Sequence, residues 1–271
     1  MAQEVTAQSR FDIVLPDSGR KLEALWIGPG PEASPTLIFL HEGLGCVALW
    51  RDFPMRLSAQ LGWGALVFSR LGYGGSDPCP LPRPVGFMHH EGRLVLPQVI
   101  QQTGIRRHVL VGHSDGGSIA LLYAGGYARP ELMGVVTLAA HVFCENLTRQ
   151  SIRAARDRYR DGDLKRRLMA YHGENTHCAF WGWNDVWLHP DFVDWNIEDY
   201  LPEIRVPVLS LQGQDDPYGT QAQLDAIGRK VGSRVRIEVV PDCGHAPHLE
   251  QTDRVLDTIA TFLIGQFSNH C

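Results

Sequence analysis

The sequence lacks the patterns that would place it in several broad classes of protein. Its six cysteines lie far apart and form no Cys-x-x-Cys pair, so a zinc ribbon or thiol redox motif is not indicated, and we expect free thiols. No stretch approaches the roughly 20 apolar residues of a membrane span. Residues 1–11 also lack the basic-then-apolar layout of a secretory signal. We therefore expect a cytoplasmic protein with no membrane partner.

Basic runs and metal-ligand spacings are missing as well. Lys and Arg number 25 against 30 Asp and Glu, and this net charge of -5 argues against a nucleic-acid partner. Several histidine groups occur, but none has a third ligand at a suitable spacing, so we expect no metal and no other cofactor. These groups are His89-His90-Glu91, His172 with His177, and His245 with His248.

Short apolar runs alternate with helical patterns along most of the 271 residues. An antiparallel hairpin is predicted over 11–26. Continuous apolar runs typical of strands buried on both faces follow it, and helical spacing separates them. These runs are 36–40, 65–69, 107–111, 134–139, 206–212 and 235–240. The alternation predicts an α/β fold with a mostly parallel sheet of about eight strands and flanking helices.

One segment interrupts this alternation. Residues 142–201 are helical in pattern, rich in aromatic residues and without a strand-like run. We interpret them as a helical cap inserted into a core made of 1–141 and 202–271. The insertion should lie above the carboxyl edge of the sheet, where Trp181, Trp183 and Trp187 are predicted to line an apolar or aromatic substrate pocket.

The strongest motif is Gly112-His113-Ser114-Asp115-Gly116. It follows a predicted strand and precedes an apolar helix, which is the setting of a nucleophile elbow. A turn that sharp leaves no room for side chains two residues before and after the serine, and glycine supplies that room. The pattern predicts a nucleophilic hydroxyl on Ser114.

A serine nucleophile needs a base and an acid that orients the base. In a parallel sheet such groups gather after the carboxyl ends of strands. Two loops that follow predicted strands supply them, one with Asp215 and Asp216 and one with His245. The chain order serine, aspartate, histidine matches one known arrangement of this triad.

With these residues the chain resembles the α/β-hydrolase superfamily, over about residues 11–267. In that family the acid usually falls three residues after the glycine of its loop, here Gly213, which favours Asp216 over Asp215. The resemblance implies Ser114 as nucleophile, His245 as general base and then general acid, and Asp216 as the residue that orients His245.

The resemblance also implies an oxyanion hole of two backbone N–H groups. Asp115 would provide one, and the loop after the 36–40 strand would provide the other, from Gly43 or Leu44. The family commonly has His-Gly-x-Gly in this loop, whereas this chain has Glu42 after the histidine. We expect Glu42 either to point away and pair with Arg51 or Arg70, or to influence substrate preference.

The sequence therefore predicts a serine hydrolase for carboxylic esters of small to medium apolar or aromatic molecules. Cleavage of a C–C bond in a ring-cleavage product, and of lactones or thioesters, would use the same three residues. A small-molecule receptor on the same fold is the alternative outside enzymes. The expected partner is a small-molecule substrate, and a homodimer stays open.

Overall fold

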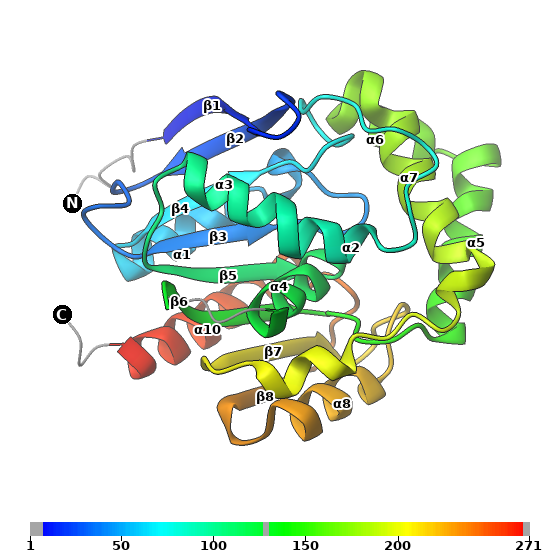
Figure 1. Cartoon of the computed structure of the whole chain (residues 1–271). Coiled ribbons are helices and arrows are strands. Elements are labelled where there is room, and N and C mark those ends of the chain that lie inside the picture. Colours follow the sequence, from blue (N-terminus) through cyan, green and yellow to red (C-terminus); the bar gives the residue numbers. More distant parts are fainter. Residues whose placement is uncertain (1–7, 127–129, 268–271) are drawn as a thin grey trace.

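The computed structural model describes residues 8–126 and 130–267. Its eight strands form one sheet in the order β1-β2-β4-β3-β5-β6-β7-β8 (Figure 1). The strands are β1 (Gln8–Val14), β2 (Lys21–Ile27), β3 (Thr36–Leu40), β4 (Gly64–Phe68), β5 (His108–His113), β6 (Leu132–Leu138), β7 (Val208–Gly213) and β8 (Val235–Val240). The pairs β1–β2 and β2–β4 are antiparallel, and the five remaining pairs are parallel.

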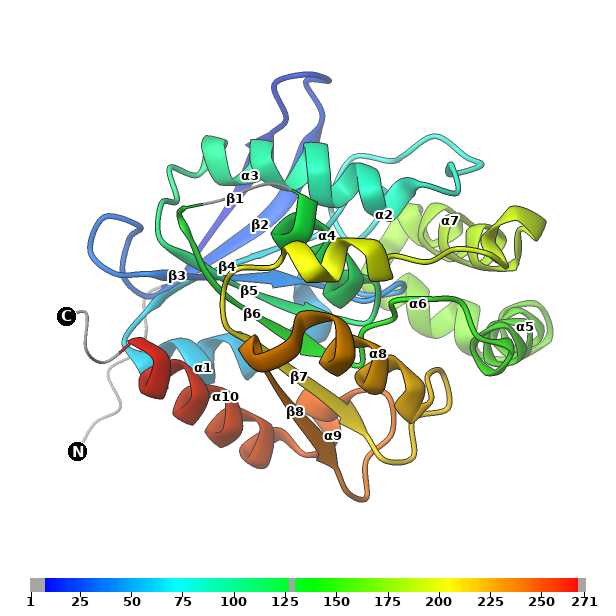
Figure 2. The same cartoon turned by 60° about the horizontal axis from the view of Figure 1, so that its bottom comes forward.

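Helices cover both faces of this sheet (Figure 2). They are α1 (Phe53–Leu61), α2 (Phe87–His90), α3 (Leu96–Gln102), α4 (Asp115–Gly126), α5 (Asn146–Asp161), α6 (Leu164–His172), α7 (Thr176–Leu188), α8 (Gln221–Val231), α9 (Pro247–Glu250) and α10 (Thr252–Phe267). The predicted fold, a mostly parallel eight-stranded sheet with flanking helices, is confirmed.

Alternating side chains of the central strands build a separate core on each face. From β3, Ile38 and Leu40 contact the cluster under α3, α4 and α8. Leu37 and Phe39 contact the cluster under α1 and α10. Because both faces are covered, β3 is apolar throughout, as expected for a strand buried on both sides.

Three helices, α5 to α7, lie together beyond the carboxyl ends of β3 and β5 (Figure 1). The rings of Tyr159 on α5 and Phe180 on α7 stack with centroids 3.7 Å apart, which holds two of these helices together. Asn196 forms an isolated bridge with Phe143, where the chain returns toward the sheet. The short helix Glu198–Glu203 already packs against α4 and α8.

Within residues 8–126 and 130–267, no helix combines the length and the apolar character needed to cross a bilayer.

Candidate active site

The turn between β5 and α4 holds Ser114 in a constrained position. Ser114 has a φ of +52°, in the left-handed region that side chains rarely adopt. A Cβ on Gly112 would overlap the backbone of Gly116, and a Cβ on Gly116 would overlap the carbonyl oxygen of Leu40. Glycine is thus required at both positions by close backbone contact, and the turn presents the Ser114 hydroxyl beyond the end of the sheet.

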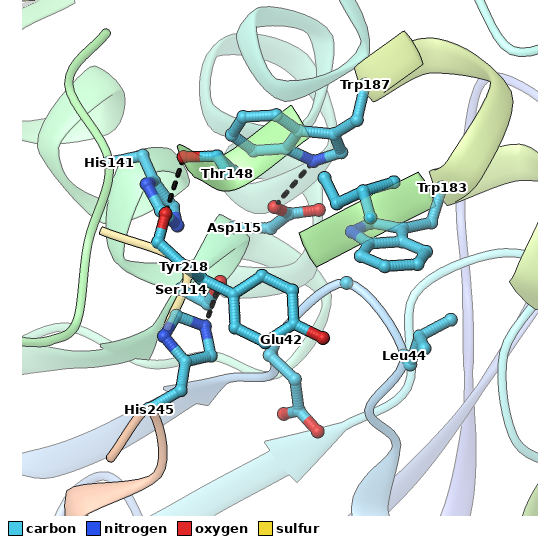
Figure 3. A pocket seen from close by; sticks show the side chains of 12 residues that line it. Glu42, Leu44, Ser114, Asp115, His141, Thr148, Trp183, Trp187, Tyr218 and His245 are labelled. Carbon is cyan, nitrogen blue, oxygen red and sulfur yellow. Dashed lines mark hydrogen bonds between the residues drawn. The ribbon is translucent and has the colours of Figure 1, made fainter. Parts of the chain in front are cut away.

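Two loops bring His245 and Asp216 to this hydroxyl. His245 Nε2 lies 3.0 Å from Ser114 Oγ (Figure 3). His245 Nδ1 lies 2.8 and 2.9 Å from the two carboxylate oxygens of Asp216. Asp215, in contrast, is exposed. The structure therefore brings together Ser114, His245 and Asp216, and leaves Asp215 outside the group.

The environment of Asp216 keeps it ionised. Its side chain is only 1% exposed, and it also accepts a hydrogen bond from the backbone N–H of Tyr218 at 2.8 Å. Burial by itself would raise the pKa of Asp216, but the hydrogen bond and charge of His245 outweigh it and hold that pKa below its usual value. An ionised Asp216 accepts a hydrogen bond from His245 Nδ1. With its proton held on Nδ1, the ring has Nε2 free to accept the proton of Ser114.

The loop after β3 lies beside Ser114, and Gly43 and Leu44 both line the pocket there, together with Asp115. A Cβ on Gly43 would overlap the indole of Trp183, so this glycine allows the ring to pack on the loop. The buried Arg70 guanidinium donates hydrogen bonds to the backbone carbonyls of His41 and Glu42. These contacts fix the path of a loop that could supply an N–H donor.

Glu42 pairs with His113, and not with Arg51 or Arg70 as the sequence suggested. Its carboxylate folds back over Gly45, where a Cβ would overlap it, and lies 3.3 Å from His113 Nδ1. His113 Nε2 lies 2.7 Å from the backbone oxygen of His245. Because both ring nitrogens of His113 face acceptors, the doubly protonated ring makes both bonds.

This ion pair shifts the pKa values of both partners. Burial lowers the pKa of His113, but the hydrogen bond and charge of Glu42 outweigh burial and raise it above 6.5. Burial likewise would raise the pKa of Glu42, yet His113 holds it well below its usual range. The pair links the loop after β3, the end of β5 and the loop of His245.

Replacing Glu42 by glutamine should therefore destabilise the protein in a pH-dependent way. We expect the free energy of unfolding to fall by about 1–3 kcal/mol, because the buried His113 loses its charged partner. The raised pKa of His113 stabilises the wild type fully below pH 6.5, and this contribution is lost as pH rises through the folded value. The lowered pKa of Glu42 stabilises the wild type above pH 4.5, and this contribution is lost as the pH falls through the folded value.

The difference in stability between wild type and Glu42→Gln should thus be largest between about pH 4.5 and 6.5 and shrink at alkaline pH. Urea unfolding at a series of pH values measures it. Glu32→Gln is the matched control, since Glu32 is exposed and lies 3.9 Å from Arg106. If the difference in unfolding free energy is the same at pH 5.5 and pH 9, or if Glu32→Gln reproduces it, the ion pair between Glu42 and His113 is not its cause.

The pocket above Ser114 has a volume of about 100 Å³ (Figure 3). Trp183 and Trp187, four residues apart on one face of α7, line it. Trp181 does not, because two residues along a helix turn the side chain to another face, where it packs against Tyr159 and Phe180. The lining residues are Glu42, Gly43, Leu44, Ser114, Asp115, His141, Thr148, Ile152, Trp183, Trp187, Tyr218 and His245.

Four lining residues were not identified from the sequence. His141 follows the carboxyl end of β6, so the strand-end rule that located Asp216 and His245 could have found it. Burial, aided by the charge of His245, lowers its pKa to about 3, so it is neutral. Tyr218, whose ring centroid lies 4.7 Å from that of His245, follows Asp216 by two residues. Thr148 and Ile152 on α5 carry no such signal.

Within 8–126 and 130–267, no three side chains of His, Cys, Asp or Glu are grouped so that they could hold a metal ion.

Comparisons with known proteins give relatives of this chain. It is 21% identical to the proline iminopeptidase of Lactobacillus delbrueckii subsp. bulgaricus, over 89% of this chain and 93% of that protein. The 2-hydroxy-6-oxo-6-phenylhexa-2,4-dienoate hydrolase of Rhodococcus sp. strain RHA1 has a similar fold (TM-score 0.76, 17% identity, 97% and 100% of the two chains). So has a putative aryl esterase from Burkholderia cenocepacia (TM-score 0.72, 22% identity, 96% and 100%).

The family model described as "Alpha/beta hydrolase family" matches residues 37–258. This range includes the turn of Ser114 and the loops of Asp216 and His245. The chain belongs to the alpha/beta hydrolase family.

Proposed function

We propose that this protein is a serine hydrolase that cleaves carboxylic esters of small to medium apolar or aromatic substrates. The observation that carries the proposal is the continuous chain of contacts from Ser114 through His245 to the buried Asp216, at the base of a pocket lined by two tryptophans. A hydroxyl, an imidazole and a carboxylate in this order are what nucleophilic catalysis by serine requires.

In the proposed reaction His245 Nε2 takes the proton of Ser114 as Oγ attacks the ester carbonyl. The negative charge on the carbonyl oxygen is stabilised by the backbone N–H of Asp115 and by that of Gly43 or Leu44. His245 then gives its proton to the departing alcohol, and an acyl group stays on Ser114. Water, deprotonated by His245, releases the acid and restores the serine.

The segment 142–201 has the role of a cap in this proposal. Its helices α5 and α7 supply Thr148, Ile152, Trp183 and Trp187 to the pocket, while the sheet supplies Ser114. An apolar roof over the nucleophile favours apolar acyl or alcohol groups, because their burial contributes about 25 cal/mol per Å².

A substrate panel tests the proposal directly. We would measure hydrolysis of p-nitrophenyl esters of increasing chain length, aromatic esters, lactones, thioesters and a vinylogous diketone. Wild type should cleave the esters fastest, and Ser114→Ala should be inactive. Preference for the diketone would assign C–C bond hydrolysis to the same residues, and binding of these compounds without turnover would indicate a receptor.

The tryptophans of α7 should differ in their effect on substrate preference. We expect Trp183→Leu or Trp187→Leu to change the ratio of kcat/KM for an aromatic ester to that for acetate at least tenfold. This change is about 1.4 kcal/mol, the burial of roughly 55 Å² of apolar surface. Trp181→Leu is the matched control on the same helix and should leave the ratio near that of wild type. If all three substitutions change the ratio equally, the position of a tryptophan in the pocket does not determine substrate preference.

A further inference from the structure

Asp115 has one carboxylate oxygen in the pocket without a partner among the described residues. Asp115 is fully buried, and its Oδ1 accepts a hydrogen bond from Trp187 Nε1 at 3.1 Å. In the part of the chain that the structure describes, nothing donates a hydrogen bond to its Oδ2. Buried polar atoms are almost always hydrogen-bonded, so this oxygen is suited to a donor from a ligand.

The unpaired carboxylate oxygen belongs to a side chain that faces the pocket. Figure 3 shows the Asp115 carboxylate below the indole of Trp187, between Ser114 and Trp183, and all four residues line the cavity. Leu44, Ile152 and the two tryptophans make much of the remaining pocket lining apolar. A carboxylate in such surroundings discriminates strongly among ligands, because a ligand without a donor leaves it unpaired.

The ionised form of Asp115 is the one that needs a donor from the substrate. Burial raises the pKa of Asp115, although the charge of Arg70 and the hydrogen bond from Trp187 oppose this shift. In its ionised form Asp115 would stand beside the carbonyl oxygen that becomes negative in the proposed reaction, and two like charges there would repel. A donor group on the substrate that pairs with Oδ2 favours the ionised carboxylate, and an ammonium also offsets its charge.

The position of Asp115 indicates which part of the substrate carries the donor. The leaving alcohol must take its proton from His245, and Asp115 lies on the opposite side of Ser114 from His245 (Figure 3). The acyl group therefore extends toward Asp115. The backbone N–H of Asp115 would hold the carbonyl oxygen of this acyl group. The Asp115 side chain is short, so a substrate group that reaches it lies close to the carbonyl carbon.

Building on the proposed function, we propose that Asp115 is a specificity-determining residue that selects acyl groups with a hydroxyl or ammonium on the carbon next to the carbonyl. The cavity of about 100 Å³ suits a small acyl group of this kind. Its remaining apolar substituent would lie against Trp183 and Trp187.

Three isosteric ethyl esters test this selection: 2-methylpropanoate, 2-hydroxypropanoate and 2-aminopropanoate. They differ only in a methyl, hydroxyl or ammonium at one position, and release of acid is followed by titration. We expect wild-type kcat/KM to be at least tenfold higher for the hydroxyl or the ammonium ester than for the methyl ester. The ester with the larger advantage identifies the donor.

Two substitutions assign the preference to Asp115, and both keep its backbone N–H. Asp115→Leu removes the acceptor and should bring the three kcat/KM values within about threefold of one another. Asp115→Asn keeps an acceptor without the charge and should retain a preference for hydroxyl while losing one for ammonium. Thermal unfolding checks that each variant is folded.

The outcomes separate the two proposals. If wild type cleaves all three esters with less than a twofold spread, or if Asp115→Leu keeps the wild-type ratios, the role of Asp115 is overturned while the hydrolase proposal stands. If wild type cleaves no ester, including p-nitrophenyl acetate, the proposed function itself fails.

Discussion

Ser114→Ala should lower ester hydrolysis by at least about a thousandfold, in line with the removal of a serine nucleophile in other triads. The reason is structural: Ser114 Oγ is the atom hydrogen-bonded to His245 Nε2, and alanine leaves that base with nothing to activate. The wild type should also react with one equivalent of a fluorophosphonate, as Oγ attacks phosphorus and fluoride leaves. Intact-protein mass spectrometry and peptide mapping measure the adduct.

Ser118→Ala is the matched control for this substitution. Ser118 is a buried serine one turn further along α4, and its hydroxyl donates to the backbone oxygen of His141. It makes no contact with His245 among the described hydrogen bonds, so its loss should reduce activity far less. An adduct mapped to Ser118 or Ser69, or full activity in Ser114→Ala, would contradict the nucleophile assignment.

The fold could be predicted from the sequence because its signals are local. Strands buried on both faces, such as β3 and β5, are continuous apolar runs, and helices between them have their own spacing. The position of Ser114 could also be predicted, because close backbone contacts at Gly112 and Gly116 exclude any other residue there. The order of strands places the loops of Asp216 and His245 at the same edge, which explains why a rule about strand ends located them.

The partner of Glu42 could not be predicted in this way. Arg51 and Arg70 were the cations that the sequence offered, but Arg70 binds backbone carbonyls and the carboxylate turns toward His113. The direction of the Glu42 side chain depends on Gly45, over which it folds, and on His113, whose pKa the charge and hydrogen bond of Glu42 raise against the effect of burial. Such a choice depends on tertiary contacts.

The placement of the tryptophans shows a second limit. Composition identified residues 142–201 as rich in aromatic side chains, but not which of them face the substrate. The rotation of α7 about its axis, its phase, directs Trp183 and Trp187 into the pocket. It directs Trp181 elsewhere, with Arg160 over its ring at 5.3 Å. That phase is fixed by the packing of α7 on α5, which the sequence alone did not define.

Asp216→Asn should also be strongly damaging, lowering kcat by about 10³–10⁴-fold. In wild type, Oδ1 of Asp216 accepts from the Tyr218 N–H at 2.8 Å, and this contact would keep the oxygen of an asparagine in the same place. The amide nitrogen would then occupy the position of Oδ2, which lies 2.9 Å from His245 Nδ1.

The amide nitrogen then replaces one of the two oxygens that accept from His245 Nδ1, and the neutral side chain holds the proton of the ring on Nδ1 less strongly, so that the ring can carry it on Nε2. A protonated Nε2 cannot accept the proton of Ser114, so the nucleophile is not activated although the fold is intact. Asp215→Asn is the matched control, because Asp215 is exposed and its substitution should leave kcat within about twofold of wild type. Steady-state kinetics of both variants measure the effect, and a larger loss in Asp215→Asn would transfer the orienting role to that residue.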